Sequence, residues 1–191
     1  MSDSSTEFNI ERPTGILKEA SFILSPNHDQ RPDPTDIIGI VLHNISLPPG
    51  QFNGDWITDF FLNRLDPTVH PYFAEIASLR VSAHVLIRRN GELIQYVPFH
   101  LRAWHAGESC WKGRQRCNDF TIGIELEGDD HSAFAAEQYQ SLSKVIQALC
   151  VTYPTLSKTA ITGHEHIAPG RKTDPGPFFD WAALYATLSD D

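Results

Sequence analysis

Residues 37–42, IIGIVL, form a short apolar run rich in β-branched side chains. This is the pattern of a strand that is buried on both faces of a sheet. The run ends at His43-Asn44, and the LPPG that follows contains two prolines and a glycine, which stop regular structure. The chain is therefore expected to be organised around a central sheet, with two polar side chains placed at the end of one of its strands.

Helical and strand patterns alternate along the rest of the chain. Asp55 can cap a helix with an apolar stripe, and residues 136–153 carry a longer stripe of the same kind. Residues 82–97 predict a hairpin in which Asn90-Gly91 supplies two positive-φ turn positions. Further elements are expected as one short element within residues 16–24, strands at 120–128 and 158–163, and a last helix capped by Asp180. The predicted class is α/β with a mixed sheet, because at least one strand pair is a hairpin.

The chain length and the net charge limit the number of domains and the kinds of partner that we expect. The 191 residues fit one domain over 1–191, with a core at about residues 20–189. The net charge of −9 opposes general binding of nucleic acid or anionic lipid. The opening MSDSSTEFNI lacks the basic and apolar parts of a secretory signal, and three cysteines do not form a disulfide framework. A cytoplasmic location is expected, without a nucleic-acid, membrane or obligate protein partner.

Two of the nine histidines stand at the ends of predicted strands, where open α/β sheets build their sites. They are His43 and His164, and the segment that follows His164 adds Lys172 and Asp174 on a proline-rich loop. Two imidazoles and one carboxylate suffice for a catalytic zinc that keeps one position open for water. The alternative is an ordinary loop contact between His164 and Asp174. His84, inside a predicted strand, fits a core histidine as well as a ligand.

The strand at residues 120–128 carries two carboxylates on one face. Ile122, Ile124 and Leu126 share the opposite face, as the period of two requires. Glu125 and Glu127 are equivalent in this pattern, so the residues alone do not tell a catalytic base from a solvated strand carboxylate.

Several segments closely resemble the cytoplasmic 1,6-anhydro-N-acetylmuramoyl-L-alanine amidases, zinc enzymes that share their fold with peptidoglycan recognition proteins. The similar segments occur in the family's order and reach from about residue 20 to the last helix. They are VLHNISLPPG, HPYFAEIASLRVSAHVLIRRNGELIQYVPF, RAWHAG, RCNDFTIGIELEG and GHEHIAPGRKTDPGPFFDW. The resemblance implies a central mixed sheet flanked by helices, with one zinc ion per chain. Glu165-His166 is a visible departure from the family's pattern.

The resemblance also implies roles for individual residues. The family's zinc ligands fall on His43, His164 and Asp174, its catalytic carboxylate on Glu125, and its transition-state lysine on Lys172. Its substrate contacts fall on Asn44, Trp104, Arg80 and Arg116. The indole of Trp104 would lie against a sugar ring, and the two arginines would bind carboxylates of a peptide stem. Alternatively, Trp104 belongs to the core and the arginines form exposed ion pairs.

The expected activity is hydrolysis of the amide bond between 1,6-anhydro-N-acetylmuramic acid and L-alanine in muropeptides returned from cell-wall turnover. Two alternatives remain open. One is a module of the same fold that binds peptidoglycan fragments without turnover, which predicts loss of a ligand or of Glu125. The other is a zinc peptidase that cuts between amino acids of the stem.

Overall fold

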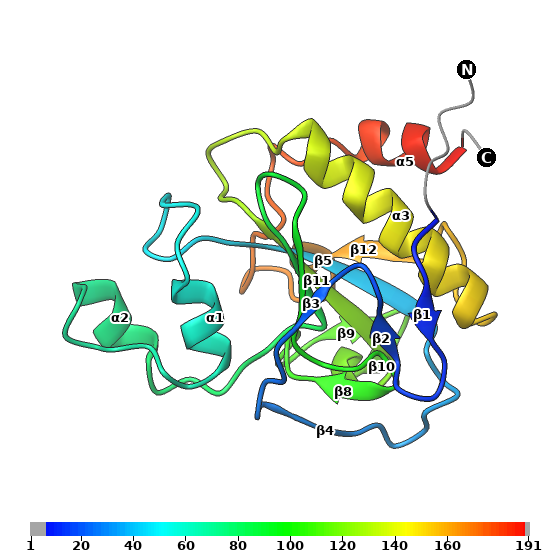
Figure 1. Ribbon diagram of the computed structural model, residues 1–191, viewed down its shortest axis with the longest axis horizontal. Coiled ribbons are helices and arrows are strands. Elements are labelled where there is room, and N and C mark those ends of the chain that lie inside the picture. The colour runs from blue at the N-terminus through cyan, green and yellow to red at the C-terminus, as the bar shows by residue number, and fades with distance from the viewer. Residues whose placement is uncertain (1–6, 190–191) are drawn as a thin grey trace.

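The computed structural model describes residues 7–189 and contains a six-stranded sheet at its centre (Figure 1). The β6–β7 pair is antiparallel and the other pairs are parallel, so the expected mixed sheet is confirmed. In spatial order the strands are β12 (Ile161–Gly163), β5 (Gly39–Ile45), β11 (Thr121–Glu127), β6 (Val85–Ile87), β7 (Leu93–Gln95) and β3 (Ser21–Phe22).

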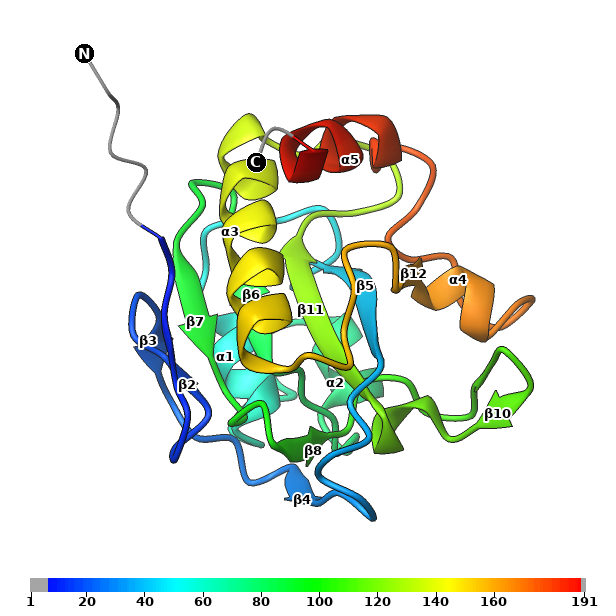
Figure 2. The same cartoon turned by 90° about the vertical axis from the view of Figure 1, so that its right-hand side faces the viewer.

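Helices cover both faces of this sheet. The long helix α3 (Ala136–Thr152) and α5 (Trp181–Ser189) lie together over one face, as Figures 1 and 2 show. The short helices α1 (Trp56–Phe61) and α2 (Pro71–Ile76) lie at one end of the molecule. Among residues 7–189, no helix has both the length and the apolar character needed to cross a bilayer.

Smaller elements complete the described chain. The helix α4 (His164–Ile167) follows β12 directly, and a 3-10 turn, η1 (Cys117–Asp119), precedes β11. Three two-stranded ribbons lie outside the main sheet: β1 (Ile10–Glu11) with β2 (Ile16–Leu17), β4 (His28–Gln30) with β8 (Leu101–Ala103), and β9 (Cys110–Trp111) with β10 (Arg114–Gln115).

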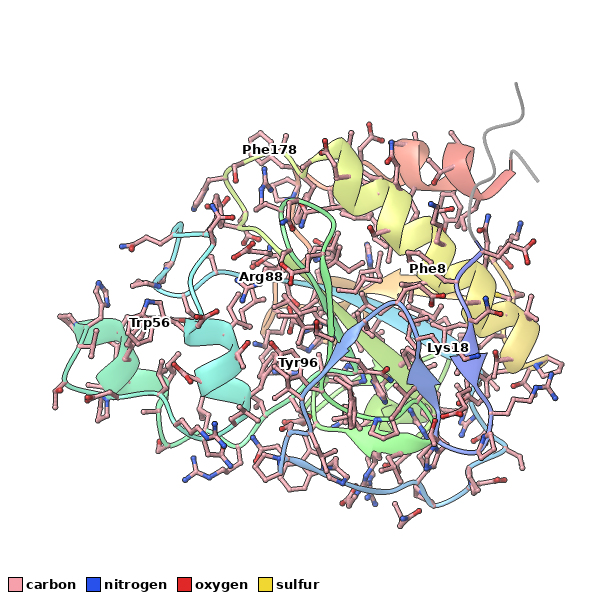
Figure 3. The ribbon with its side chains drawn as sticks, in the orientation of Figure 1. Phe8, Lys18, Trp56, Arg88, Tyr96 and Phe178 are labelled. Carbon is pink, nitrogen blue, oxygen red and sulfur yellow. The ribbon has the colours of Figure 1, made fainter. Side chains whose placement is uncertain are left out.

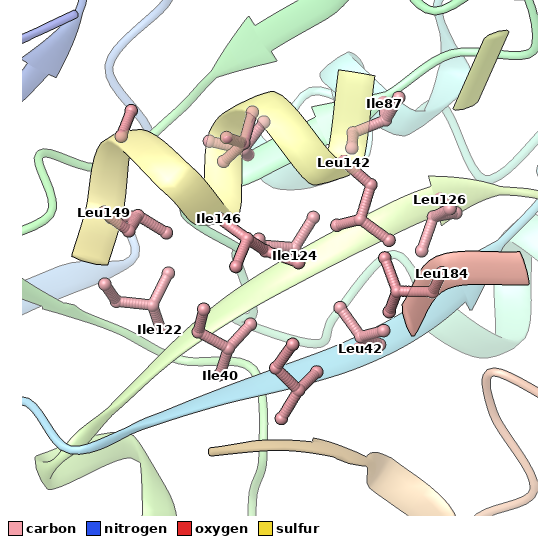
Figure 4. Close-up of a cluster of buried hydrophobic side chains, with 14 of the residues drawn as sticks. Ile40, Leu42, Ile87, Ile122, Ile124, Leu126, Leu142, Ile146, Leu149 and Leu184 are labelled. Atoms are coloured by element: carbon pink, nitrogen blue, oxygen red, sulfur yellow. The ribbon is translucent and has the colours of Figure 1, made fainter. Parts of the chain in front are cut away.

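The main core lies between α3 and the central strands (Figure 4). Alternate residues of each strand point toward the helix because the side-chain period of a strand is two. Fully burying one such side chain contributes about 1.5–3 kcal/mol. The buried set includes Ile40 and Leu42 of β5, Ile122, Ile124 and Leu126 of β11, Leu142, Ile146 and Leu149 of α3, and Leu184 of α5.

A second apolar cluster joins the other face of the sheet to α1 and α2. Leu86 and Tyr96 pack there, whereas Val85 and Ile87, on either side of Leu86 in β6, belong to the α3 core. The Tyr96 hydroxyl lies 2.6 Å from Thr58 Oγ1 in α1. Trp56 and Tyr96 are labelled in Figure 3. The sheet is therefore covered on both sides, which agrees with the apolar run at residues 37–42.

Local details correct three expectations. At the turn between β6 and β7 only Gly91 has a positive φ, of 82°. Asn90 instead accepts a hydrogen bond from the Glu92 N–H through its side chain, so a second positive φ is not needed. Residues 16–24 form two strands, because β2 pairs with β1 and β3 pairs with β7. Asp55 does not cap α1 with its side chain, which contacts Arg88 at 3.2 Å.

Candidate active site

Strand register brings the predicted site residues together. β5 and β11 are parallel neighbours, and His43 is the register partner of Glu125. On the other side of β5, Gly163 at the end of β12 is the partner of Leu42, so His164 follows beside His43. Both histidines and Glu125 are at least nine-tenths buried. His164 directly follows β12, as expected, whereas β5 continues past the predicted end of its strand to Ile45, so His43 lies inside it.

Three ligand-type atoms form a small triangle at this edge of the sheet. His43 Nδ1 lies 2.9 Å from Asp174 Oδ2 and 3.0 Å from His164 Nδ1. The third side, from His164 Nδ1 to Asp174 Oδ2, measures 3.0 Å. We call these three residues the ligand triangle.

The hydrogen-bond partners of His164 indicate which of its two ring nitrogens faces the other residues of the ligand triangle. Its Nε2 lies 3.0 Å from the carbonyl oxygen of Ala106, which can only accept a hydrogen bond. The proton of a neutral His164 is therefore on Nε2, and its bare Nδ1 faces a carboxylate oxygen. Two acceptor atoms at 3.0 Å repel each other unless a positive charge, either a proton or a metal ion, lies between them. Burial lowers the pKa of His43 to about 4 although Asp174 opposes the shift, so the His43 imidazole is uncharged at neutral pH.

The size and chemistry of the triangle fit a divalent transition metal. Zinc bonds of about 2.0–2.1 Å at tetrahedral angles place ligand atoms about 3.3–3.4 Å apart. The sides of the triangle are 2.9–3.0 Å, so a shift of a few tenths of an ångström would suffice. Two imidazoles and one carboxylate leave further coordination positions open, as a catalytic site requires.

The structure separates the two carboxylates that the sequence left equivalent. Glu127 is held by backbone N–H groups, from Asn53 at 2.7 Å to Oε1 and from Arg89 at 3.1 Å to Oε2. Glu125 Oε2 is buried and has no hydrogen-bond partner among residues 7–189. Burial, with a smaller contribution from Asp174, raises the pKa of Glu125 well above its ordinary value, and Lys172 opposes this shift. Backbone N–H groups thus hold Glu127 in place, whereas Glu125 keeps an oxygen that no described residue hydrogen-bonds.

A cavity of about 490 Å³ opens onto these groups. Its volume is in the range of small-molecule sites. Glu125, Lys172 and the ligand triangle line it together with apolar side chains of α1 and α2, namely Phe60, Phe61, Tyr72 and Ile76. Lys172 is exposed, so its ammonium group is accessible to a molecule in this cavity.

Of the four predicted substrate contacts, one lines the cavity and three do not. Asn44 lines the cavity, and its amide group donates to Asp130 Oδ1 at 2.7 Å and to the Pro175 carbonyl at 3.0 Å. Three others lie outside the residues that line the cavity. The Trp104 backbone N–H donates to Ser82 Oγ at 3.1 Å. Arg80 donates to the carbonyls of Ala77 and Leu79, and Arg116 pairs with Asp119 at 3.3 Å.

Sequence reasoning missed other cavity residues. Asp129 and Asp130 line the cavity, and they directly follow the strand predicted at residues 120–128, so the strand-end rule applied to His43 would also have indicated them. His84 is a hydrogen-bonded core histidine, whose Nδ1 accepts from the Gly123 N–H at 3.0 Å. The departure Glu165-His166 lies outside the cavity lining, where the His166 ring is 6.2 Å from that of Trp181.

Comparison with known proteins gives a consistent result. The profile of the N-acetylmuramoyl-L-alanine amidase family (Amidase_2) matches residues 33–177. The 1,6-anhydro-N-acetylmuramyl-L-alanine amidase AmpD of Citrobacter freundii is 57% identical over 175 residues, which cover 92% of this chain and 93% of the relative. A crystal structure of a selenomethionine AmpD derivative matches with a TM-score of 0.89 and 57% identity, covering 92% of this chain and 98% of the other.

A more distant solved structure contains a ligand. It is the complex of the Escherichia coli amidase AmiD with the substrate anhydro-N-acetylmuramic acid-L-Ala-D-gamma-Glu-L-Lys. It is 30% identical to this chain, has a TM-score of 0.58, and covers 80% of this chain and 57% of the other.

Proposed function

Because the chain belongs to the N-acetylmuramoyl-L-alanine amidase family, we propose that it hydrolyses the amide bond between 1,6-anhydro-N-acetylmuramic acid and L-alanine. Its substrates would be muropeptides returned for cell-wall recycling. The observation that carries the proposal is the ligand triangle beside a buried carboxylate with an unpartnered oxygen. The similarity to AmpD over 92% of the chain supports the choice of the anhydro sugar.

One zinc ion is the proposed cofactor, and His43, His164 and Asp174 would hold it. When bound, zinc supplies a Lewis acid for the amide carbonyl and lowers the pKa of a coordinated water toward about 7. The donor set of two imidazoles and a carboxylate supports zinc, although imidazole also suits other transition metals. Metal analysis of the purified protein should find one zinc per chain, and His43→Ala should lower that occupancy sharply.

Glu125 would transfer protons during the reaction, and Lys172 would stabilise the negative charge that develops. Glu125 accepts a proton from the attacking water and later delivers it to the alanine nitrogen as the carbon–nitrogen bond breaks. None of the described residues hydrogen-bonds its Oε2, which supports this role. The Lys172 ammonium stabilises the negative charge that develops on the carbonyl oxygen. Lys172→Met should therefore keep zinc and lose rate, whereas a bystander lysine would leave turnover near normal.

Substrate contacts are proposed for Asn44, Trp104, Arg80 and Arg116. The place of Asn44 in the cavity lining supports a contact with the reacting part of the substrate. Arg80 and Arg116 are exposed, so their guanidinium groups are accessible to the carboxylates of a peptide stem. Alanine variants of these arginines should react more slowly, and shortened stems should do the same to the parent enzyme.

The deciding experiment compares specificity constants for anhydro and reducing muropeptides with the same stem. A pocket shaped for the anhydro ring would bury an extra unpaired hydroxyl of the reducing sugar, at about 1–3 kcal/mol, so the anhydro form should be preferred at least about tenfold. Equal constants would refute the recycling assignment while leaving the amidase chemistry intact. Mass spectrometry of the products tests the alternatives: cleavage within the stem indicates a peptidase, and binding without products indicates a recognition module.

A cytoplasmic location is part of the same proposal. The three cysteines, Cys110, Cys117 and Cys150, are all free thiols in the structure. Unpaired thiols are usual in a reducing compartment. Fractionation of the producing cells tests this location directly.

A further inference from the structure

His43 has a second ring nitrogen that points away from the ligand triangle. Its Nε2 lies 3.0 Å from His105 Nδ1, and the two rings meet edge to face at an interplanar angle of 83°. A single proton lies between these nitrogens when both imidazoles are neutral. Its position decides whether His43 Nδ1 is a bare ligand atom or a protonated one.

A chain of hydrogen bonds fixes the position of that proton. It begins at the Cys117 carbonyl oxygen, which can only accept and lies 2.7 Å from Thr121 Oγ1. The hydroxyl proton of Thr121 is thereby committed, so its oxygen accepts from His105 Nε2 at 3.4 Å. His105 then has a bare Nδ1, which accepts the Nε2–H of His43. It follows that His43 Nδ1 is bare.

We propose that His105 is a positioning residue for the metal: together with Thr121 it sets the tautomer of His43 and aims His43 Nδ1 into the ligand triangle before the ion binds. This inference rests on the metal site of the proposed function. The hydrogen-bond partner of a ligating imidazole ordinarily fixes its tautomer and orientation in this way.

His105 is itself held from two directions. Its backbone N–H and that of Ala106 both donate to Asn118 Oδ1, at 3.1 and 2.8 Å. Its ring lies so close to Gly123 that a Cβ there would come within 2.3 Å of His105 Cγ. Since the Ala106 carbonyl accepts from His164 Nε2, two consecutive residues support both histidine ligands.

The same geometry argues against His105 as a ligand in the triangle. Its Nδ1 contacts Nε2 of His43, whereas the triangle contains Nδ1 of His43. The His43 ring therefore lies between His105 and the triangle. A merely space-filling role for His105 is the remaining alternative, and the variants below separate it from positioning.

The first test measures zinc affinity by competition with a chelator, without any muropeptide. His105→Leu removes the acceptor and should weaken zinc binding by about 10–100-fold. His105→Asn places an amide oxygen near the position of Nδ1 and should restore most of the affinity, whereas His105→Gln reaches toward Nε2 and should not. Thr121→Val should weaken binding by a smaller factor. The matched control Thr58→Val also loses a partly buried hydroxyl contact, with Tyr96, but should bind zinc like the parent.

The second test needs no variant and no metal. Nitrogen-15 NMR of the metal-free protein reports the tautomer of each histidine, and His43 should have its proton on Nε2. A proton on His43 Nδ1 would overturn the inference, as would parent-like zinc affinity in His105→Leu or equal loss in His105→Leu and His105→Asn. A wild-type protein that binds no zinc would refute the metal site of the proposed function. The tautomer measurement would still decide the role of His105.

Discussion

Replacing Gly123 by alanine would displace the ring of His105, the residue that we propose positions the metal ligand His43. Gly123 lies in β11 on the face that His105 covers, and an added Cβ would meet Cγ at 2.3 Å and both Cδ2 and Nδ1 at 2.6 Å. Ordinary van der Waals contacts begin at 3.4 Å. The His105 ring would therefore have to retreat by at least about 1 Å, the difference between 2.3 and 3.4 Å. The Asn118 side chain fixes the backbone of residues 105 and 106, so the ring must turn rather than slide.

The size of the effect follows from the hydrogen bond that this movement breaks. His105 Nδ1 and His43 Nε2 are 3.0 Å apart, and lengthening by about 1 Å ends the bond. Gly123→Ala should consequently bind zinc about 10–100-fold more weakly. Overpacking of a buried position should also reduce the free energy of unfolding of the metal-free protein by about 1–3 kcal/mol. Chelator competition measures the first quantity, and urea denaturation measures the second.

Gly39→Ala provides the matched control. On the neighbouring strand β5, a Cβ at Gly39 would come within 2.2 Å of Trp111 Cζ3, which is an equally severe clash with an aromatic ring. Trp111 takes no part in the hydrogen bonds to His43, so this variant should lose stability and keep its zinc affinity. The reasoning is refuted if Gly123→Ala loses stability but binds zinc within twofold of the parent, or if both variants lose affinity equally.

Three further results are expected. Glu125→Gln should retain zinc while turnover falls by roughly 10²–10⁴-fold, measured by metal analysis and steady-state kinetics; near-normal turnover would exclude Glu125 as the base. Since burial raises the pKa of Glu125 above its ordinary 4.5, folding of the metal-free protein takes up a proton above that pH. Its free energy of unfolding should therefore fall relative to Glu125→Gln as the pH rises from 4.5, and a pH-independent difference would contradict this. Leu142→Ala, at a fully buried position of α3, should cost about 2–5 kcal/mol of stability by urea denaturation and leave zinc affinity unchanged.

Local patterns predicted much of the fold because they reflect burial. Residues 39–42 of the apolar run form the first part of β5, and residues 136–152 of the apolar stripe form α3. Asp180 does cap α5, by accepting from the Ala183 N–H at 2.9 Å. The order of the strands could not be predicted in this way, since a strand buried on both faces has the same pattern in any interior position of a sheet.

The same distinction applies to the active site, where local patterns could be predicted and contacts between distant segments could not. His43 and His164 were recognisable because each comes directly after an apolar run in the sequence, but their contact depends on β12 pairing with β5. Glu125 and Glu127 share one face, and groups brought in by distant residues distinguish them, among them the N–H groups of Asn53 and Arg89 that hydrogen-bond Glu127. The link from His105 to His43 joins a loop to a strand 62 positions away, and no local pattern encodes such a contact.

Strand β11 carries two kinds of selective constraint in alternate positions. Substitutions at Ile122, Ile124 and Leu126 are limited only by side-chain volume and apolar character, because these residues face the α3 core. Thr121, Gly123 and Glu125 alternate with them on the face toward the metal site. A library that varies the first set among apolar residues of similar size should therefore yield folded enzymes of differing heat tolerance and nearly constant turnover. A library of the second set should lose activity at almost every step, so directed evolution of robustness and of catalysis can proceed on separate residues of a single strand.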